Sequence, residues 1–523
     1  MYDVCWLRAL GLKINSRIVD TMIAASLVDE NRFRYDLNGC GRDFVGKGKD
    51  ETALYEAAKS WGVDPKAEMY KLPAMYVGAY AERDAQLTFE LWQELKKQIL
   101  HQDIEDIFNM ETKLFPVLVD MRFLGVRVNV DRAAIEKKKM VEEEKRLLGG
   151  VYAETGQEVQ IWAARSIAKV FDKLGLPYDR TAKTQAPSFT KNFLANHPHK
   201  IVQAIAKARE INKAHTTFLD TILKYSGKGR IHAEINQLRG DSGGTVTGRF
   251  SMNNPNLQQI PARDPEIKSL IRGLFLPEEG TKWGSFDYAS QEPRWLAHYC
   301  AQLSGVHRHP QIDNVIQMYQ KGNADFHQMV ADLASITRKE AKTVNLGIMY
   351  GMGRKKLAGV MGIDEEQAKA LLAQYHENVP FVKGIADLAA ETASTSGSIR
   401  TWLGRKCRFD MWEPISFGYS KALKIEEALK EYGGKGRIRR AFTYKALNKL
   451  IQGSSADQTK KAMVDCYKEG LIPMLTVHDE LCFSIKSKDQ ANRIVDIMEN
   501  CIPKLNVPFE VDMALVNNWG EVE

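Results

Sequence analysis

Residues 338–351 read RKEAKTVNLGIMYG and repeat a distinctive residue at every fourth position. The repeated positions are Arg338, Lys342, Leu346 and Tyr350. Because an α-helix turns every ~3.6 residues, the spacing predicts one stripe along a helix. Two cations near its start and an aromatic ring near its end suit a ligand that is polyanionic at one end and flat at the other. A nucleoside triphosphate has this form; a solvated basic helix face is the simpler alternative.

A pair of aspartates is predicted to meet across a sheet. Asp287 follows an apolar run at residues 283–286 that is typical of a buried strand, and a helix carrying Glu292 and Arg294 is expected next. Asp479 lies in MLTVHDELCFSI, where two apolar runs flank a polar turn, as in a hairpin. Carboxylates paired on a rigid sheet repel each other unless a divalent cation lies between them. The pair therefore predicts a Mg²⁺ site for phosphoryl transfer, although each aspartate alone is typical of a turn or cap.

The three segments resemble, in this order, the motifs of family A DNA polymerases, the DNA polymerase I type. DYASQEPR resembles motif A, RKEAKTVNLGIMYG motif B and VHDE motif C. Further matches are TGRFSMNNPNLQQIP from Thr247, ADFHQ around His327 and NKLIQGSSAD from Asn448. The similarity extends over nearly the whole chain, and a set of this length and order is far more specific than VHDE alone.

The resemblance implies a multidomain fold of the α+β and α/β classes, a right-hand polymerase preceded by a partial ribonuclease H-like exonuclease domain. The exonuclease-like part would occupy residues 1–102 and the polymerase domain residues 103–523. Within the polymerase domain we expect a thumb at about 130–247, a palm at about 248–324 and 441–523, and fingers at about 325–440.

The same resemblance implies template-directed addition of dNTPs to a DNA primer in replication, with two Mg²⁺ ions and Mn²⁺ as a substitute. Asp287 and Asp479, helped by the main-chain carbonyl of Tyr288, would hold the ions. Lys342 would bind phosphate and protonate the leaving pyrophosphate. The other residues expected at the dNTP are Arg338, His327, Leu346, Tyr350 and Glu292, and those expected at primer-template DNA are Arg249, Asn448, Gln452 and Arg294.

Substrate choice is expected to depend on two groups of side chains. Glu292 would fill the volume that a ribose 2′-OH needs. Arg249 and the amides of Asn448 and Gln452 can donate to minor-groove acceptors that all correct base pairs share, which tests pair geometry without reading sequence.

Three positions depart from the common family pattern. Leu346 stands where phenylalanine or tyrosine is commonest, Ser290 replaces a glutamine, and Tyr444 replaces an arginine. A 5′ nuclease domain is also absent from this chain. Together these features favour a phage-type replicative polymerase. We also expect the protein to act as a monomer.

An α/β-like exonuclease remnant is expected near the N-terminus. Tyr80 and Asp84 lie one helical turn apart and resemble the last exonuclease motif, while Tyr2 and Asp3 resemble the end of the middle motif. The first motif, an Asp-x-Glu pair, does not occur here. Because this type of site needs metal ions held by several carboxylates, we expect no proofreading from this chain.

Composition agrees with this interpretation. The chain has 523 residues, enough for several domain-sized units, and its net charge of +7 favours contact with a phosphate backbone. Its seven cysteines form no CxxC pair, so neither a zinc site nor a disulfide framework is indicated. We find no signal peptide or membrane-spanning run, and we expect the cytoplasm of a bacterium or a phage-infected bacterium.

Two other functions share part of the pattern. A single-subunit RNA polymerase has the two aspartates and the basic helix, but Glu292 and the exonuclease remnant argue against it. An inactive nucleic-acid-binding scaffold would be expected to have lost Asp287, Asp479 or Lys342, and all three are present.

Overall fold

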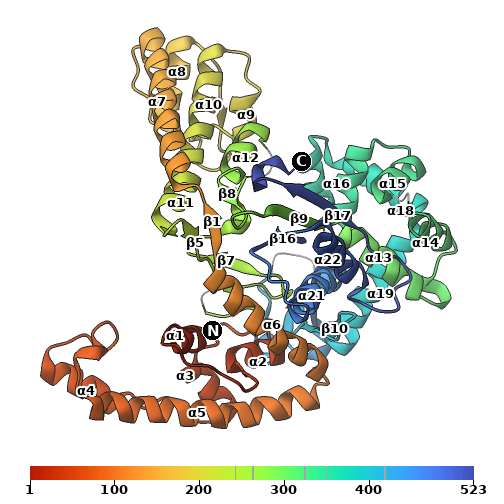
Figure 1. Cartoon of the computed structure of the whole chain (residues 1–523). Helices are drawn as coiled ribbons and strands as arrows, with labels where there is room; N and C mark the ends of the chain where they lie inside the picture. Colours follow the sequence, from red (N-terminus) through yellow and green to blue (C-terminus); the bar gives the residue numbers. More distant parts are fainter. Residues whose placement is uncertain (242, 262–263, 323–324, 350–351, 417–419, 523) are drawn as a thin grey trace.

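The computed structural model describes the chain except residues 242, 262–263, 323–324, 350–351, 417–419 and 523. Tyr350 and Gly351, both in the segment expected to bind nucleotide, therefore lie outside the described residues, as does the side chain of Leu346. The remaining chain folds into mixed helix and sheet, as the sequence predicts (Figure 1).

A four-stranded antiparallel sheet lies at the centre of the molecule. Its order is β15 (Leu475–Val477), β16 (Glu480–Ile485), β9 (Lys282–Tyr288) and β17 (Val511–Val516). Asp287 in β9 lies opposite Glu480 on one side and opposite Asp512 on the other. Because directly opposed residues project to the same face, the three carboxylates form a row across one end of the sheet.

The opposite face of this sheet carries the apolar core. Phe286 and Phe483 are fully buried there, with ring centroids 5.7 Å apart. Helix α22 (Lys488–Asn500) packs on this face, where the hydroxyl of Tyr288 donates to the Met498 carbonyl at 2.7 Å. The long helix α21 (Ala446–Lys468) packs in turn against α22 and against α13 (Gln291–Gln302). The predicted strand, hairpin and following helix are thus confirmed.

A block of helices stands beside the sheet (Figure 1). It contains the predicted basic helix, which is confirmed as α16 (Arg338–Met349). Helix α16 packs against α15 (Phe326–Ala334), whose N-terminus is capped by Asp325. The other helices of the block are α14 (Gln311–Gln320), α17 (Arg354–Met361), α18 (Glu365–Asn378) and α19 (Pro380–Ser396).

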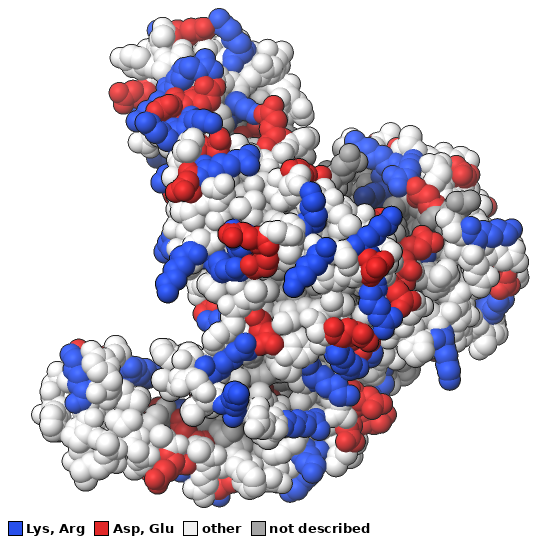
Figure 2. Space-filling model, in the orientation of Figure 1, with Lys and Arg blue, Asp and Glu red and all other residues white. Residues whose placement is uncertain are grey.

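A helical arm projects on the other side of the sheet and has a small core of its own around Phe171. Its helices are α7 (Val130–Thr155), α8 (Ala164–Leu174), α9 (Lys191–Ala195), α10 (Lys200–Lys213) and α11 (Asp220–Tyr225). Figure 2 shows basic and acidic side chains interspersed along the arm. Lys139 and Arg146 on α7 pair with glutamates three residues earlier, as expected of a solvated helix face.

The prediction of an α/β-like fold for residues 1–102 is wrong. All of these residues are described, and they form helices and turns without a strand. A sheet needs several paired strands, and this segment supplies none. Its apolar residues instead pack helix on helix, with α2 (Thr21–Val28) against the long α5 (Ala74–His101) and α6 (Glu105–Leu124).

Among the described residues, no helix combines the length and the apolar character needed to cross a bilayer.

Candidate active site

Asp287 and Asp479 lie together at the acidic end of the central sheet. Asp287 is near the end of β9, and Asp479 sits in the turn between β15 and β16, where His478 adopts a left-handed φ of 59°. The side chain of Asp287 is open to solvent at this edge, but desolvation by the surrounding protein and the charges of Asp479, Glu480 and Asp512 raise its pKa to about 8. Burial also raises the pKa of Asp479. Each carboxylate is therefore costly to ionise beside the others.

This donor set fits a divalent cation that is completed by substrate. Within the described residues, no group of three or more Asp, Glu, His or Cys side chains is arranged to hold a metal by itself. Mg²⁺ is commonly bound by only one or two carboxylates together with water and substrate phosphates, which matches a pair such as Asp287 and Asp479. The buried hydroxyl of Tyr288 points to the opposite face of the sheet, so only its main chain can contribute.

Two neighbouring hydrogen-bond donors fix the orientation of the Glu480 side chain. Its Oε1 atom accepts from the hydroxyl of Ser285 at 2.6 Å and from the indole N–H of Trp519 at 3.1 Å. Sequence reasoning missed both Glu480 and Asp512 as members of the acidic row. Only the strand register, which places each opposite Asp287, could have identified them.

The basic helix lies beside a buried histidine. Arg338 donates from Nε to Asp325 at 2.6 Å, and the side chain of Lys342 is exposed. His327 is 8% exposed, and burial and the charge of Lys342 lower its pKa. The Nδ1 atom of His327 lies 3.0 Å from the side-chain nitrogen of Asn345, a residue of α16 that flanks the predicted stripe and to which the sequence assigned no role. Arg338, Lys342 and His327 thus lie near one another beside the first half of α16, and their role as phosphate ligands stays a prediction.

The predicted DNA contacts divide into two groups. Arg249 forms an ion pair with Glu292 beside Asp479, and Asn448 and Gln452 are partly exposed on α21, one turn apart. The roles of Arg249, Asn448 and Gln452 at primer-template DNA stay predictions.

The prediction that Arg294 contacts DNA, by contrast, is wrong. It is 2% exposed, and its guanidinium donates to the Ala289 and Pro508 carbonyls and to the Glu510 carboxylate. Residues two apart on a helix face different sides, so Glu292 and Arg294 on α13 diverge. The arginine fastens α13 to the segment before β17.

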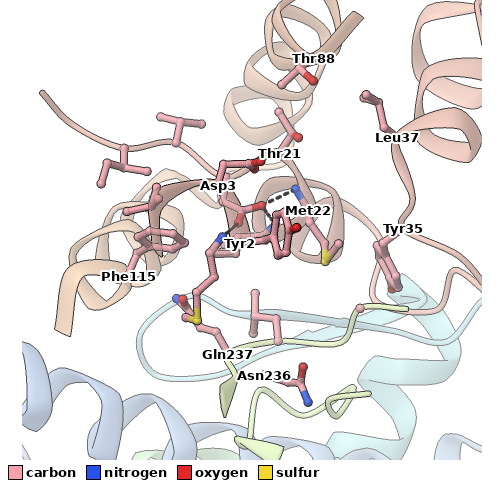
Figure 3. A pocket seen from close by; sticks show the side chains of 18 of the residues that line it. Tyr2, Asp3, Thr21, Met22, Tyr35, Leu37, Thr88, Phe115, Asn236 and Gln237 are labelled. Atoms are coloured by element: carbon pink, nitrogen blue, oxygen red, sulfur yellow. Dashed lines mark hydrogen bonds and ion pairs between the residues drawn. The ribbon is translucent and has the colours of Figure 1, made fainter. Parts of the chain in front are cut away.

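The residues of the expected exonuclease remnant lie around two different pockets. Asp3 and Tyr2 line a cavity of about 480 Å³ with Thr21, Met22 and residues near Gln237 (Figure 3). Tyr80 lines a second pocket, where Lys49 donates to its hydroxyl at 2.9 Å and pairs with Asp84 at 2.5 Å. A cation of the protein itself thus compensates the Asp84 carboxylate.

Comparison with known proteins identifies the family. The model of DNA polymerase family A matches residues 131–521. The chain belongs to this family. A DNA-directed DNA polymerase of Pseudomonas phage M6 is 33% identical to this family A polymerase, over 99% of this chain and 82% of the phage protein. DNA polymerase DpoZ of Acinetobacter phage SH-Ab 15497 is 29% identical, over 99% of this chain and 87% of that protein.

Bacterial relatives extend the similarity beyond phages. The thermostable DNA polymerase I of Thermus aquaticus is 31% identical over 78% of this polymerase and 48% of the bacterial protein. Among solved structures, the POL domain of Pol1 from M. smegmatis, in complex with DNA primer-template and dNTP, shares the fold with a TM-score of 0.77. That match has 23% identity and covers 98% of this chain and 84% of the other. The chain is a DNA-directed DNA polymerase of phage-like type, and the RNA polymerase alternative receives no support.

Proposed function

We propose that this polymerase extends a DNA primer by two-metal nucleotidyl transfer at the sheet end that carries Asp287 and Asp479. The observation that carries the proposal is the strand register that sets Asp287 opposite Glu480 and Asp512, next to Asp479 in the β15–β16 turn. The crowding of these carboxylates agrees with the raised pKa of Asp287. When bound, Mg²⁺ supplies Lewis acidity toward the primer 3′-OH and compensates charge on the leaving pyrophosphate, and Mn²⁺ would substitute.

The remaining roles belong to the chain's own side chains. Arg338, Lys342 and His327 bind the triphosphate, and Lys342 is placed to protonate the pyrophosphate. Leu346 and Tyr350 belong beside the base and sugar of the dNTP.

Residues near the primer end select the sugar of the incoming nucleotide and the geometry of the base pair. Glu292 excludes a 2′-OH, and Arg249, Asn448 and Gln452 donate to the minor groove of the primer-template. A structural neighbour whose title names both DNA primer-template and dNTP supports these partners.

The units of the fold take the parts expected of a right-hand polymerase. The arm of α7 to α11 serves as the thumb, the helical block of α14 to α19 as the fingers, and the central sheet with α21 as the palm. Phage polymerases among the relatives support a role in phage DNA replication.

We also propose that this chain does not proofread. The support is the ion pair of Asp84 with Lys49, which replaces the charge that a metal would supply. Asp3, another carboxylate of the expected set, lines a different pocket from Tyr80.

Primer extension on a defined template tests the proposed function. Each dNTP and each rNTP is offered singly, with Mg²⁺ and with EDTA. We expect incorporation of the complementary dNTP alone, and only with Mg²⁺. Extension that ignores the template, or that persists in EDTA, would contradict the proposal.

A further inference from the structure

Three buried side chains from three helices of the block form a hydrogen-bonded chain that ends at His327. Tyr375 in α18 donates its hydroxyl to the Oδ1 atom of Asn345 in α16 at 2.6 Å. The Nδ2 atom of Asn345 lies 3.0 Å from Nδ1 of His327 in α15. Their exposed fractions are 0% for Tyr375, 1% for Asn345 and 8% for His327, so water does not replace these contacts readily.

The direction of the hydrogen bonds fixes the tautomer of His327. The side-chain NH₂ of Asn345 can only donate, so the imidazole Nδ1 must accept and the ring proton must lie on Nε2. The opposite orientation of the amide would make the Tyr375 hydroxyl an acceptor. Its own proton would then be buried without an acceptor among the described residues, which is unfavourable.

The surroundings keep this imidazole neutral. Burial and the charges of Lys342 and Arg338 on α16 lower the pKa of His327, and only Asp325, at the start of its own helix, opposes them. The group that α18 presents is the hydroxyl of Tyr375, whose pKa burial raises, so it remains a neutral donor. A neutral imidazole with its proton on Nε2 donates one directed hydrogen bond and adds no charge beside Lys342 and Arg338.

We propose that Asn345 and Tyr375 are positioning residues that hold His327 in the Nε2–H tautomer, so that it donates a hydrogen bond to the triphosphate of the dNTP. This rests on the proposed function for the place of the triphosphate. The relay also connects α15 and α18 to α16. Lys342 then compensates the charge of the phosphates, and His327 donates a hydrogen bond that orients them.

Steady-state kinetics test the relay with a matched pair of variants. Tyr375→Phe removes only the hydroxyl that orients Asn345. Tyr319→Phe is the control, because Tyr319 is 1% exposed and its hydroxyl has no partner among the described atoms. The loss of one neutral hydrogen bond changes a binding constant about fivefold. We therefore expect Tyr375→Phe to raise the KM for dNTP about fivefold with kcat nearly unchanged. Tyr319→Phe should leave the KM unchanged, and thermal unfolding of both variants verifies that they fold.

¹⁵N NMR of histidine-labelled protein tests the tautomer without any turnover. The His327 signals are assigned by their loss in His327→Gln. We expect an Nε2–H ring in the wild type at neutral pH. In Asn345→Asp we expect a proton on Nδ1 instead, because a carboxylate accepts only.

The outcomes separate the relay from the proposed function. A wild-type His327 with its proton on Nδ1, or averaging between tautomers, in an active polymerase would overturn the relay alone. An equal rise in KM for Tyr375→Phe and Tyr319→Phe would also overturn it. A wild type that incorporates no dNTP would overturn the proposed function, and the triphosphate contact with it.

Discussion

Arg249 and Glu292 form an ion pair beside Asp479. The arginine expected to contact the minor groove is thus held by the carboxylate expected to exclude a ribose. We therefore predict that sugar selection and primer contact are coupled, so that a substitution at either residue changes both properties.

Glu292→Ala should admit ribonucleotides, because it opens the volume that a 2′-OH needs. The ratio of kcat/KM for dNTP over rNTP should fall at least about tenfold, or ~1.4 kcal/mol. Glu292→Gln is the matched control. It keeps the volume and removes the charge, so it should retain selection while weakening the hold on Arg249. An unchanged ratio in Glu292→Ala would refute the steric gate.

The crowding of Asp287 should make stability depend on pH and on Mg²⁺. Its folded pKa of about 8 lies above the ordinary value of 3.8, so the folded state holds this proton more tightly than the unfolded state. Its contribution to the free energy of unfolding is therefore lost as pH rises from about 4 through 8. In EDTA at pH 8, Asp287→Asn should melt a few degrees above the wild type, and the difference should shrink at pH 5. Mg²⁺ should raise the melting temperature of the wild type more than that of the variant, and the reverse order would contradict this account.

A buried ionic cluster should dominate the stability of the join between α6 and α21. Glu111 accepts from both Arg405 and Lys460, and Arg405 also pairs with Asp457. All four side chains are nearly inaccessible to solvent, and burial lowers the pKa of Lys460 to about 8. Removing one partner of such a cluster typically costs about 3–5 kcal/mol.

Lys460→Met should consequently lower the urea midpoint far more than Lys461→Met. The neighbouring Lys461 pairs with Asp465 near the surface of the same helix, where such a pair contributes less than about 1 kcal/mol. Shifts of equal size would show that the cluster contributes little.

Degradation of a mismatched primer end tests the absence of proofreading. With Mg²⁺ and no dNTP, the wild type should leave the 3′ end intact, because Lys49 already compensates Asp84. Hydrolysis that Asp84→Ala abolishes would overturn this prediction.

Sequence reasoning succeeded where local pattern and chemistry agree. The fourfold spacing from Arg338 predicts α16, and the apolar runs on both sides of His478 predict the β15–β16 hairpin. The motifs also single out Asp287 and Asp479, which the fold brings together at one end of the sheet; their role as metal ligands stays a prediction.

Sequence reasoning failed where contacts between distant segments determine the position of a side chain. Nothing local distinguishes Arg294, bound to distant carbonyls, from an arginine that faces DNA. Asp512 enters the acidic row only through the register of β17 with β9, and Tyr375 reaches Asn345 only through the packing of α18. Residues 1–102 fold as helices although their motifs resemble parts of an α/β domain, since a motif reports chemistry rather than strand pairing.

The most direct test of the central claim is single-nucleotide incorporation by Asp287→Asn and Asp479→Asn, with primer-template affinity measured in parallel. Affinity depends on dispersed phosphate contacts, whereas metal binding depends on these two carboxylates. Asp512→Asn is the comparison, because it removes a charge from the same row at a position not assigned to the metal. We predict that both assigned variants bind DNA nearly as the wild type does and incorporate nucleotide at less than about a tenth of its rate, while Asp512→Asn stays above that level. Incorporation above a tenth of the wild-type rate by either assigned variant would contradict the assignment.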